Sequence, residues 1–383
     1  MIDTKRYRSE IQTERFSIMR FKCMRSDLSA AVSNVSRAVS AKATIPALEG
    51  VLIKAYNDQL EISGYDLEIG IVTTVEASIT EEGEIVVSAR LFNEIIRKLP
   101  EEIVNIETDD RMITYINSGS ADYQIVGINS TEYPELPNVE EISGLTVNAE
   151  ILKNMIRQTV FATSDNMAKP IYTGSLFEIK DGLFKIEAVD GFRMAIREEN
   201  VDSDITAKFV VPAKTQNEIL KLITDNKKDV TIVVGQRHII FKIENYSIVS
   251  RLLEGNFLDY KMPSSASTEF VINTRILASS VERMALLTNE KIQSPVRCSI
   301  TADEIKLSCS TTVGRANDVI AASVRGNDVE IGFNNRYLLD ALKNADTDEV
   351  KVMLNGSLQP MIIRPVDGQS FTFLVVPMRL AAD

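Results

Sequence analysis

Three pairs of basic residues recur along the chain at spacings that could serve nucleic-acid binding. The two cations of each pair stand seven residues apart, as Arg90 and Arg97, Lys214 and Lys221, and Arg336 and Lys343. Seven residues is nearly two turns of a helix, so both cations of a pair would lie on one helical face. Six cations on equivalent faces could contact phosphates without reading base sequence, and such contacts would weaken as salt rises.

The same cations also fit a purely structural interpretation. The first member of each pair precedes an acidic residue by four positions, namely Glu94, Glu218 and Asp340. Opposite charges at this spacing support any surface helix. The spacing therefore leaves open whether the cations face DNA or only solvent.

Positive charge is concentrated in the segments that we expect to be helical. The chain has 42 Lys and Arg against 54 Asp and Glu, a net charge of -12. The predicted helices contain 13 basic and 6 acidic residues, so they carry +7 and the rest of the chain carries -19. These helices are predicted at 24–40, 88–99, 148–163, 213–223, 273–288 and 334–345. The acidic remainder would keep DNA off other surfaces.

The helices belong to a unit of about 120 residues that occurs three times. One helix recurs as "ARLFNEIIRKL" (89–99), "AKTQNEILKLI" (213–223) and "NRYLLDALKNA" (335–345). The other recurs as "DLSAAVSNVSRAV" (27–39), "ILKNMIRQTVFAT" (151–163) and "ILASSVERMALLT" (276–288). Asn148 and Asn273 precede two of these copies as candidate caps. Alternating strand-like segments lie between the helices, with hairpin turns at "YND", "IKDG" and "TADE".

The repeats predict an α+β protein of three domains, each with two helices packed on antiparallel sheet. We place the domains at 19–141, 142–262 and 263–383, after an N-terminal extension over 1–18. No apolar run is long enough to span a membrane, and the first 18 residues lack the apolar segment of a secretory signal. The three cysteines form neither a disulfide framework nor a metal motif, which favours a reducing cytoplasm.

Signs of catalysis are sparse. The chain lacks the common nucleotide-binding, hydrolase and zinc-protease motifs. Its single histidine, His238, lies in an alternating segment where a packing role is the ordinary one. Asp66 and Asp190 occupy equivalent positions, with Thr311 near that place in the third repeat. An enzyme using these two carboxylates is one hypothesis, but both follow a strand into a turn, which favours a turn role.

The sequence resembles the bacterial DNA polymerase III beta subunit family, the replicative sliding clamps, over residues 19–380. An ordered set of motifs carries the resemblance: "TIPALEGVLIK" (44–54), "GYDLEIGI" (64–71), "AVDGFRMAI" (188–196), "EGNFLDY" (254–260), "LLTNEK" (286–291), "IGFNNRYLLDAL" (331–342) and "VVPMRL" (375–380). Each motif is weak alone. Their order, their spacing and the threefold repeat are together specific.

The resemblance implies a head-to-tail homodimer of DNA-clamp domains that closes a ring around duplex DNA, with the helices inside. Such a ring has no catalytic residue, cofactor or metal. It tethers the replicative DNA polymerase by enclosure rather than by tight binding. The implied partners also include the clamp loader and other clamp-binding repair and replication proteins, in the bacterial cytoplasm at the nucleoid and away from membranes. A monomeric repeat scaffold that binds only peptides is the alternative.

The resemblance also assigns site residues. DNA-facing positions are Lys42, Asn166 and Lys214, to which we add the other cations of the three pairs. The partner-peptide pocket comprises Tyr172, Val189, Gly191, Phe192, Arg193, Met194, Leu258, Val375, Val376, Pro377, Met378, Arg379 and Leu380. The dimer interface pairs Tyr123 and Ile125 of one copy with Leu286 and Leu287 of the other. The family commonly has His at the position of Phe192 and Leu at that of Met194.

The last ten residues of the resemblance, "FTFLVVPMRL", combine two expected roles. We expect "FTFLV" to be a buried edge strand and the residues after it to line the peptide groove. The groove chemistry suits a short extended peptide with apolar anchors, because it combines Met, Val, Leu and aromatic groups with arginines at its rim.

Overall fold

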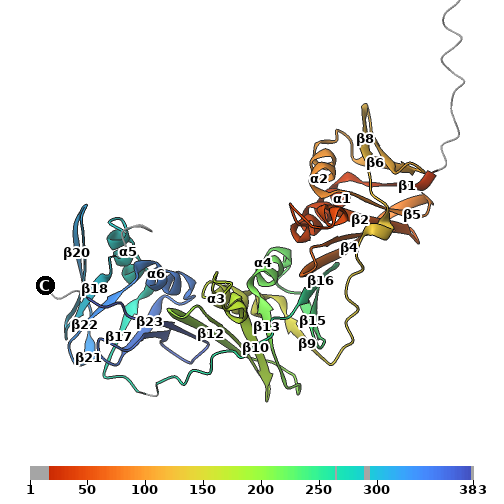
Figure 1. The fold of residues 1–383 in the computed structure, drawn as a ribbon. Coiled ribbons are helices and arrows are strands. Elements are labelled where there is room, and N and C mark those ends of the chain that lie inside the picture. The colour runs from red at the N-terminus through yellow and green to blue at the C-terminus, as the bar shows by residue number, and fades with distance from the viewer. Residues whose placement is uncertain (1–16, 264, 289–293, 381–383) are drawn as a thin grey trace, which may run out of the picture. The chain divides into compact units, whose positions relative to one another are not determined.

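The structure, a computed structural model, describes residues 17–263, 265–288 and 294–380. The predicted N-terminal extension falls outside these residues, except for Ser17 and Ile18, which begin the first strand. The described chain forms two compact units (Figure 1). Unit 1 holds the chain up to Ile142 together with Val230–Arg251, and unit 2 holds Ser143–Asp229 and the chain from Leu252 onward.

Unit 1 contains two helices and eleven strands. In chain order they are β1 (Ser17–Met24), α1 (Arg25–Val35), β2 (Gly50–Tyr56), β3 (Gln59–Tyr65), β4 (Ile69–Glu81), β5 (Gly83–Ser88), α2 (Ala89–Lys98), β6 (Ile103–Asp109), β7 (Ile113–Ser118), β8 (Ala121–Val126), β14 (Asp229–Val234), β15 (His238–Ile243) and β16 (Tyr246–Arg251). Three short 3-10 helices, η1 (Ser36–Ala38), η2 (Pro46–Glu49) and η3 (Ser130–Glu132), lie in the connections.

The sheet of unit 1 is antiparallel, with the strand order β8-β7-β6-β1-β4-β16-β15-β14. Strands β2, β3 and β5 join it beside β4, because β3 pairs with both β4 and β2, and β2 pairs with β5. Strand β16 pairs with β4 from Tyr246 opposite Thr73 to Ser250 opposite Ile69. The last three strands of the second repeat therefore extend the sheet of the first repeat.

Unit 2 contains four helices and fourteen strands. They are β9 (Ser143–Asn148), α3 (Ala149–Val160), β10 (Gly174–Lys180), β11 (Leu183–Val189), β12 (Arg193–Asn200), β13 (Ala207–Pro212), α4 (Ala213–Leu222), β17 (Thr268–Asn273), α5 (Thr274–Ala285), β18 (Val296–Ile300), β19 (Glu304–Thr311), β20 (Gly314–Ala321), β21 (Val324–Gly326), β22 (Val329–Phe333), α6 (Asn335–Asn344), β23 (Glu349–Leu354), β24 (Met361–Pro365) and β25 (Phe371–Val375). The 3-10 helix η4 (Pro170–Thr173) precedes β10.

Two sheets organise unit 2. One has the order β13-β10-β11-β12-β25-β24-β23-β17-β21, and the other has the order β20-β19-β18-β22. Helices α3 and α4 pack together, as do α5 and α6, and the four helices lie on one side of the strands (Figure 1). This arrangement leaves the opposite face of the sheets uncovered by helices.

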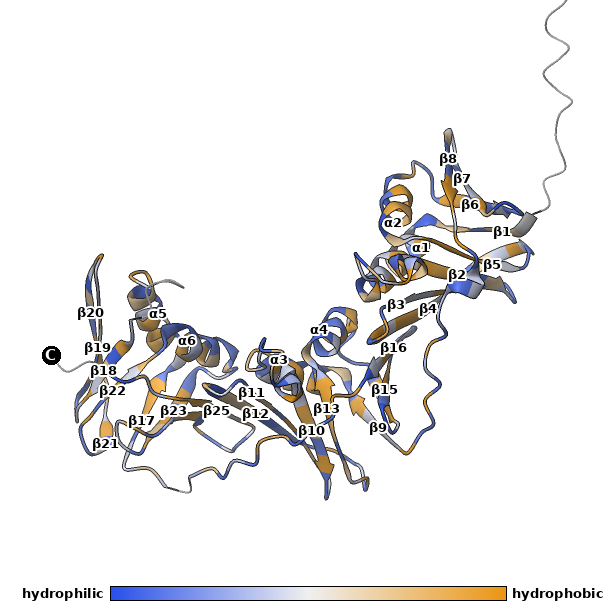
Figure 2. Ribbon diagram, in the orientation of Figure 1, coloured by the Kyte–Doolittle hydropathy of each residue, from blue (hydrophilic) through white to orange (hydrophobic). Residues whose placement is uncertain are grey.

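The helices form where the repeats predict them, for local reasons. The side chains of Asn148 and Asn273 cap α3 and α5 by accepting hydrogen bonds from the backbone N–H of Glu150 and Ile276. Such a cap satisfies an N–H that has no partner inside the helix. Figure 2 shows that the helices carry both hydrophilic and hydrophobic residues, as expected for helices that pack on a sheet. The predicted caps are therefore confirmed.

The predicted hairpin turns are confirmed as well. Asn57 and Asp58 connect β2 to β3 with φ of 51° and 56°, and Asp181 and Gly182 connect β10 to β11 with φ of 52° and 75°. Two left-handed residues in a row match the twist of the flanking strands. Residues 301–304 close the third hairpin, between β18 and β19.

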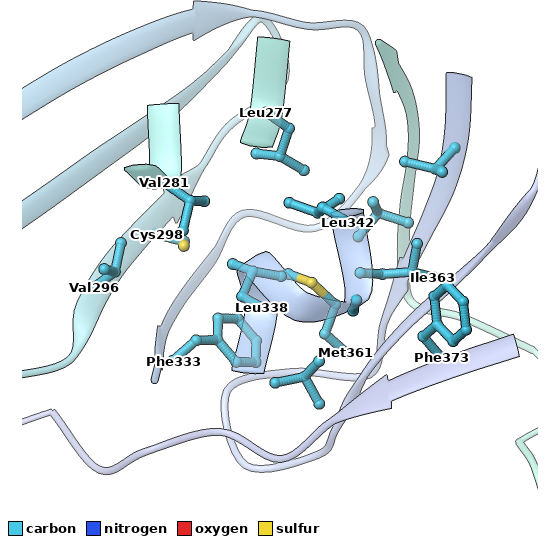
Figure 3. Packing of buried hydrophobic residues seen from close by; sticks show 14 of the residues in the cluster. Leu277, Val281, Val296, Cys298, Phe333, Leu338, Leu342, Met361, Ile363 and Phe373 are labelled. Carbon is cyan, nitrogen blue, oxygen red and sulfur yellow. The ribbon is translucent and has the colours of Figure 1, made fainter. Parts of the chain in front are cut away.

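Buried apolar side chains hold the third repeat together between its helices and sheets (Figure 3). Leu277 and Val281 of α5 meet Leu338 and Leu342 of α6, and all four are almost completely buried. Fully burying one such side chain contributes about 1.5–3 kcal/mol. The cluster also contains Phe333, Met361, Ile363 and Phe373 from strands of both sheets. Because one core joins the helices to both sheets, this repeat forms a rigid frame for the site beside it.

Candidate functional site: an apolar trough and basic helix faces

A small apolar cluster in unit 2, separate from the main cores, contains four of the residues that the sequence assigns to the peptide pocket, and we call this cluster the trough. Val189, Met194 and Leu374 are its buried members. Partly buried side chains surround them, namely Tyr172, Ile196, Phe257, Met262 and Val376. The Tyr172 and Phe257 rings meet edge to face, with 5.6 Å between centroids. The structure thus brings together Tyr172, Val189, Met194 and Val376 from four different segments.

Four members of this cluster were missed by the residue assignments from the sequence. Ile196 and Leu374 alternate with residues that face the main core, and Phe257 lies within the motif "EGNFLDY". Met262 follows in the linker. The alternation along β12 and β25 was the available signal, because residues i and i+2 of a strand share a face. Leu258, which was assigned, is exposed next to Phe257.

The turn between β11 and β12 brings Phe192 and Arg193 to the trough. Asp190 accepts hydrogen bonds from the backbone N–H of Phe192 at 2.8 Å and of Arg193 at 3.0 Å. Gly191 takes φ of 94°, a left-handed conformation that glycine adopts without strain. The Asp190 carboxylate therefore holds a turn, as the sequence favours.

The equivalent positions of the other repeats build the same kind of turn. The Asp66 carboxylate accepts from the backbone N–H of Glu68 and Ile69 at 3.0 and 2.8 Å. The Thr311 hydroxyl accepts from the N–H of Val313 at 3.2 Å. Side chains of this type commonly fix turns through such bonds. The shared positions of Asp66, Asp190 and Thr311 thus reflect repeated hairpins.

Arg193 is nearly buried, with 8% of its surface exposed. Its Nε donates to Asp190 at 2.9 Å, and its Nη1 donates to Asp340 of α6. The guanidinium carbon lies 4.8 Å from the Tyr337 ring centroid and 5.5 Å from that of Phe161. A buried cation with two carboxylates and two aromatic faces is held in one orientation, and losing one carboxylate would leave charge uncompensated.

Phe192 lies beside the trough residue Val376 and is largely exposed. It is 58% exposed, and its ring stacks on Tyr337 with 5.8 Å between centroids and 15° between planes. Its carbonyl accepts a 2.8 Å hydrogen bond from the backbone N–H of Val376. One hairpin residue thus contacts both α6 and the C-terminal run. Tyr337, absent from the sequence assignment, itself packs partly against the main core.

The C-terminal segment corrects one expectation. Strand β25 is an interior strand, because it pairs with β12 on one side and with β24 on the other. It is therefore not the edge strand expected from the sequence. The Val375 side chain points into the main core and is buried, whereas Val376 lies in the trough cluster.

The residues after Val376 run along another strand. Met378 donates its backbone N–H to the carbonyl of Gly332 in β22 at 2.7 Å. Leu380 lies against Gly332 as well, at the position that a side chain there would fill. Pro377 connects Val376 in the trough to Met378 on β22, and Arg379 is exposed. The run therefore leaves the trough within a few residues.

The cations assigned to DNA are exposed on the helices, as both interpretations require. Arg90 lies 3.8 Å from Glu94, the predicted i,i+4 pair. Lys221 and Lys343 lie 2.7 Å from Glu218 and Glu282. Lys42, Asn166, Arg97, Lys214 and Arg336 are exposed too. Salt bridges of exposed groups contribute little and leave the cations accessible.

The expected pairing of Arg336 with Asp340 is wrong. The Asp340 carboxylate lies on Arg193 instead, 147 positions away in the sequence. Arg193 is nearly buried, and a carboxylate that compensates a desolvated charge gains more than one on an exposed helix face. Asp340 of α6 thus pairs with Arg193 beside the trough and not with Arg336 on its own helix.

The residues assigned to the dimer interface differ in exposure. Tyr123 and Ile125 lie on β8, the end strand of its sheet, but Tyr123 is 39% exposed and Ile125 only 7%. Leu286, just after α5, is 84% exposed, and Leu287 packs partly against the core of the third repeat. An exposed leucine and an open strand edge are both features that a partner would cover.

The titratable groups of the described residues suit structural roles. Burial raises the pKa of the Cys23 and Cys298 thiols to about 12, with the charge of Asp27 adding to the shift at Cys23, so both stay protonated and unreactive. Burial, helped by Arg251 and Arg237, lowers the pKa of His238, which lies half-buried in β15.

No cluster of potential metal ligands occurs among the described residues. In the same part of the chain, no helix is long and apolar enough to span a membrane.

Three repeats of two helices on antiparallel sheet, with an apolar trough beside the third repeat, define a protein of the DNA-clamp class. Models of the N-terminal, central and C-terminal domains of the DNA polymerase III beta subunit match residues 19–137, 146–259 and 261–379. The chain therefore belongs to the DNA polymerase III beta subunit family. Members of this family are sliding-clamp processivity factors and not catalytic enzymes themselves.

Individual relatives agree over nearly the whole chain. The beta sliding clamp of Bacillus subtilis is 34% identical over 376 residues, which are 94% of this chain and 100% of the relative. The crystal structure of the DNA polymerase sliding clamp from Bacillus subtilis matches with a TM-score of 0.92 at 33% identity, covering 95% of this chain and all of that one. A Pseudomonas aeruginosa sliding clamp bound to griselimycin matches with a TM-score of 0.90 at 26% identity, covering 94% and 100%. The alternative of a monomeric scaffold finds no support among these relatives.

Proposed function

We propose that two copies of this chain close head to tail into a ring around duplex DNA and tether the replicative DNA polymerase. The observation that carries the proposal is the match of fold and sequence to sliding clamps over nearly the full length. Enclosure raises the effective concentration of a polymerase at its template without requiring tight binding to DNA. The exposed cations of the repeated helices would contact phosphates inside the ring, in the bacterial cytoplasm at the nucleoid.

The trough would hold the partners. Its buried Met and Val side chains suit the apolar anchors of an extended peptide, and the hairpin turn that carries Phe192 is fixed by Asp190. One relative is bound to griselimycin. The replicative polymerase, the clamp loader and other clamp-binding repair and replication proteins would use this trough in turn.

Ring closure would use the open edge of β8 and the exposed end of α5. Covering Leu286 removes an apolar side chain from water, and covering β8 gives partners to its unpaired backbone groups. Because Ile125 is already buried, we expect Tyr123 to contribute more of the contact area on that side.

Retention on circular DNA tests the proposed ring. The protein, loaded on nicked circular plasmid, should stay bound at a salt concentration that abolishes phosphate contacts, and it should be lost when the plasmid is linearised. Gel filtration of the complex before and after linearisation measures both. Equal retention on the two forms would contradict enclosure and would indicate ordinary surface binding.

Charge reversal tests the basic helix faces. Changing Arg97, Lys221 and Lys343 together to Glu should weaken low-salt DNA binding by about tenfold or more, since three favourable contacts become repulsive. The loss should shrink as salt rises. Matched reversal of Lys22, Lys180 and Lys306, exposed on one strand of each repeat, should have little effect. An equal response of both triple variants would favour the interpretation that the helix cations face only solvent.

A further inference from the structure

A cavity lies on the face of the four-stranded sheet that points away from the core. It has a volume of about 610 Å³, and polar and basic side chains dominate its lining. These include Arg297, Arg315, Arg379, Ser308, Ser310 and Asn317. We call these six residues the arginine site. None of them except Arg379 was assigned to any role above.

The strand register explains why these side chains converge. Arg297 of β18 stands opposite Ser308 of β19, which stands opposite Asn317 of β20. Arg315 and Ser310 form the next pair on the same face. Adjacent strands lie about 4.8 Å apart, and a two-residue step is about 6.8 Å. The Cα atoms of Arg297 and Arg315 are thus about 12 Å apart, which lets their long side chains approach one ligand.

Gly332 brings the C-terminal run to the same face. It pairs with Arg297 on one side and with Met378 on the other. A Cβ at Gly332 would lie 2.7 Å from Leu380 Cδ2 and 2.9 Å from the Met378 carbonyl oxygen, so only glycine leaves room for the run. Leu380 therefore covers the sheet where Arg297 emerges, and Arg379 joins the two other arginines.

The site carries excess positive charge on a strongly acidic protein. Glu330 of the same face accepts from Arg297 Nη1 at 2.6 Å. Among the described residues, Arg315 and Arg379 form no salt bridge, and both are exposed. Arg315 and Arg379, with serine hydroxyls and an amide beside them, suit carboxylate ligands, because guanidinium groups donate two parallel hydrogen bonds to a carboxylate.

The same chain segment borders both the trough and the arginine site. Val376 lies in the trough cluster, and Leu380 lies at the arginine site four residues later. Four extended residues span about 13 Å. A peptide anchored in the trough would therefore reach the arginine site with residues a few positions from its anchors.

We propose that the arginine site binds acidic side chains that flank the apolar anchors of a partner peptide seated in the trough. This inference rests on the proposed function of the trough. It adds a charge requirement to partner choice, because peptides with the same anchors would differ in affinity according to the charge of their flanking residues. Long-range attraction to the arginines would also favour acidic over basic flanks during encounter.

Matched synthetic peptides test the arginine site. Labelled peptides share one anchor, Gln-Leu-Ser-Leu-Phe, and carry four Glu or four Ser at either end. At low salt, the peptide with Glu at one of its two ends should bind the wild-type protein about three- to tenfold more tightly than the peptide with Ser at that end. A few exposed charge pairs allow an effect of this size. Fluorescence anisotropy measures the affinities. The Arg297→Gln/Arg315→Gln variant should lose this preference while binding the Ser-flanked peptides normally.

Arg325→Gln is the control, because Arg325 is an exposed arginine of β21 outside the cavity, and it should keep the preference. Equal binding of Glu- and Ser-flanked peptides to the wild-type protein, or a preference that survives in the double variant, would overturn the proposal while leaving the trough intact. Failure of every peptide to bind would overturn the trough itself. A double variant that lost affinity for a single-stranded oligonucleotide but kept the peptide preference would assign the arginines to nucleic acid instead.

Discussion

Replacing Leu286 by Asp and Leu287 by Ala is expected to leave a folded monomer, whereas we expect the wild-type protein to form a dimer of twice 42.6 kDa. Leu286 is 84% exposed, so Asp at that position places its charge in water when the chain is alone. In the dimer the same charge would have to be desolvated against apolar surface. A head-to-tail ring has two identical interfaces, so the loss is counted twice. Losing about 1.5–3 kcal/mol of leucine burial at each predicts at least a hundredfold weaker dimer.

Sedimentation equilibrium at micromolar protein decides this prediction, and circular dichroism checks the fold. Leu358→Asp is the matched control, because Leu358 is another leucine of the third repeat that is almost fully exposed. The control should remain dimeric. If the Leu286 and Leu287 variant also remains dimeric, the interface lies elsewhere on the chain. If both variants dissociate, added negative charge rather than a specific contact governs assembly.

The sequence predicted the parts of the fold that local physics decides. Helix positions followed from apolar spacing, and α3 and α5 begin at the asparagines that cap them. Asn57 and Asp58 fixed one hairpin turn, because such residues tolerate left-handed backbone. Each signal lies within a few residues of the structure it determines, and the threefold repeat made each one visible three times.

Pairings between distant segments were not available from the same signals. Strand β25 reads as a short apolar run, and nothing within it indicates that β12 and β24 lie on its two sides. Asp340 has the spacing of a helix-surface partner for Arg336, yet it pairs with Arg193. The competing environment is built by Asp190, Tyr337 and the second repeat, so only the folded chain reveals it.

The trough shows the same difference between what local sequence signals predict and what only the folded chain reveals. The resemblance identified four of the eight residues of this cluster, but it placed Val375 in the trough with Val376, although Val375 packs into the main core. The Phe192 ring stacks on Tyr337 of α6, which lies far from it in the sequence. Fine geometry in this site therefore depends on side chains that no single motif contains.

Deleting residues 376–383 is expected to abolish binding of an anchor peptide while leaving the dimer and the fold in place. The deletion removes Val376 from the trough and the Met378 backbone contact with Gly332, but it spares β25, which ends at Val375. The few residues that dominate an interface typically cost 2 kcal/mol or more when they are truncated, and this deletion removes a whole segment that borders the trough. We therefore expect the peptide affinity to fall by at least about thirtyfold, with parallel loss of polymerase stimulation.

Calorimetric titration with the Ser-flanked anchor peptide separates this expectation from a general loss of structure. A shorter deletion, of residues 381–383, should bind normally, because the described wall of the trough stays intact. Tyr172→Ala removes a trough side chain of another segment and leaves the C-terminal run unchanged, and it should also weaken binding. Since the two changes affect different segments, their variants share only the trough. Wild-type affinity in the long deletion would show that the segment after β25 only packs against β22 and that partners bind elsewhere.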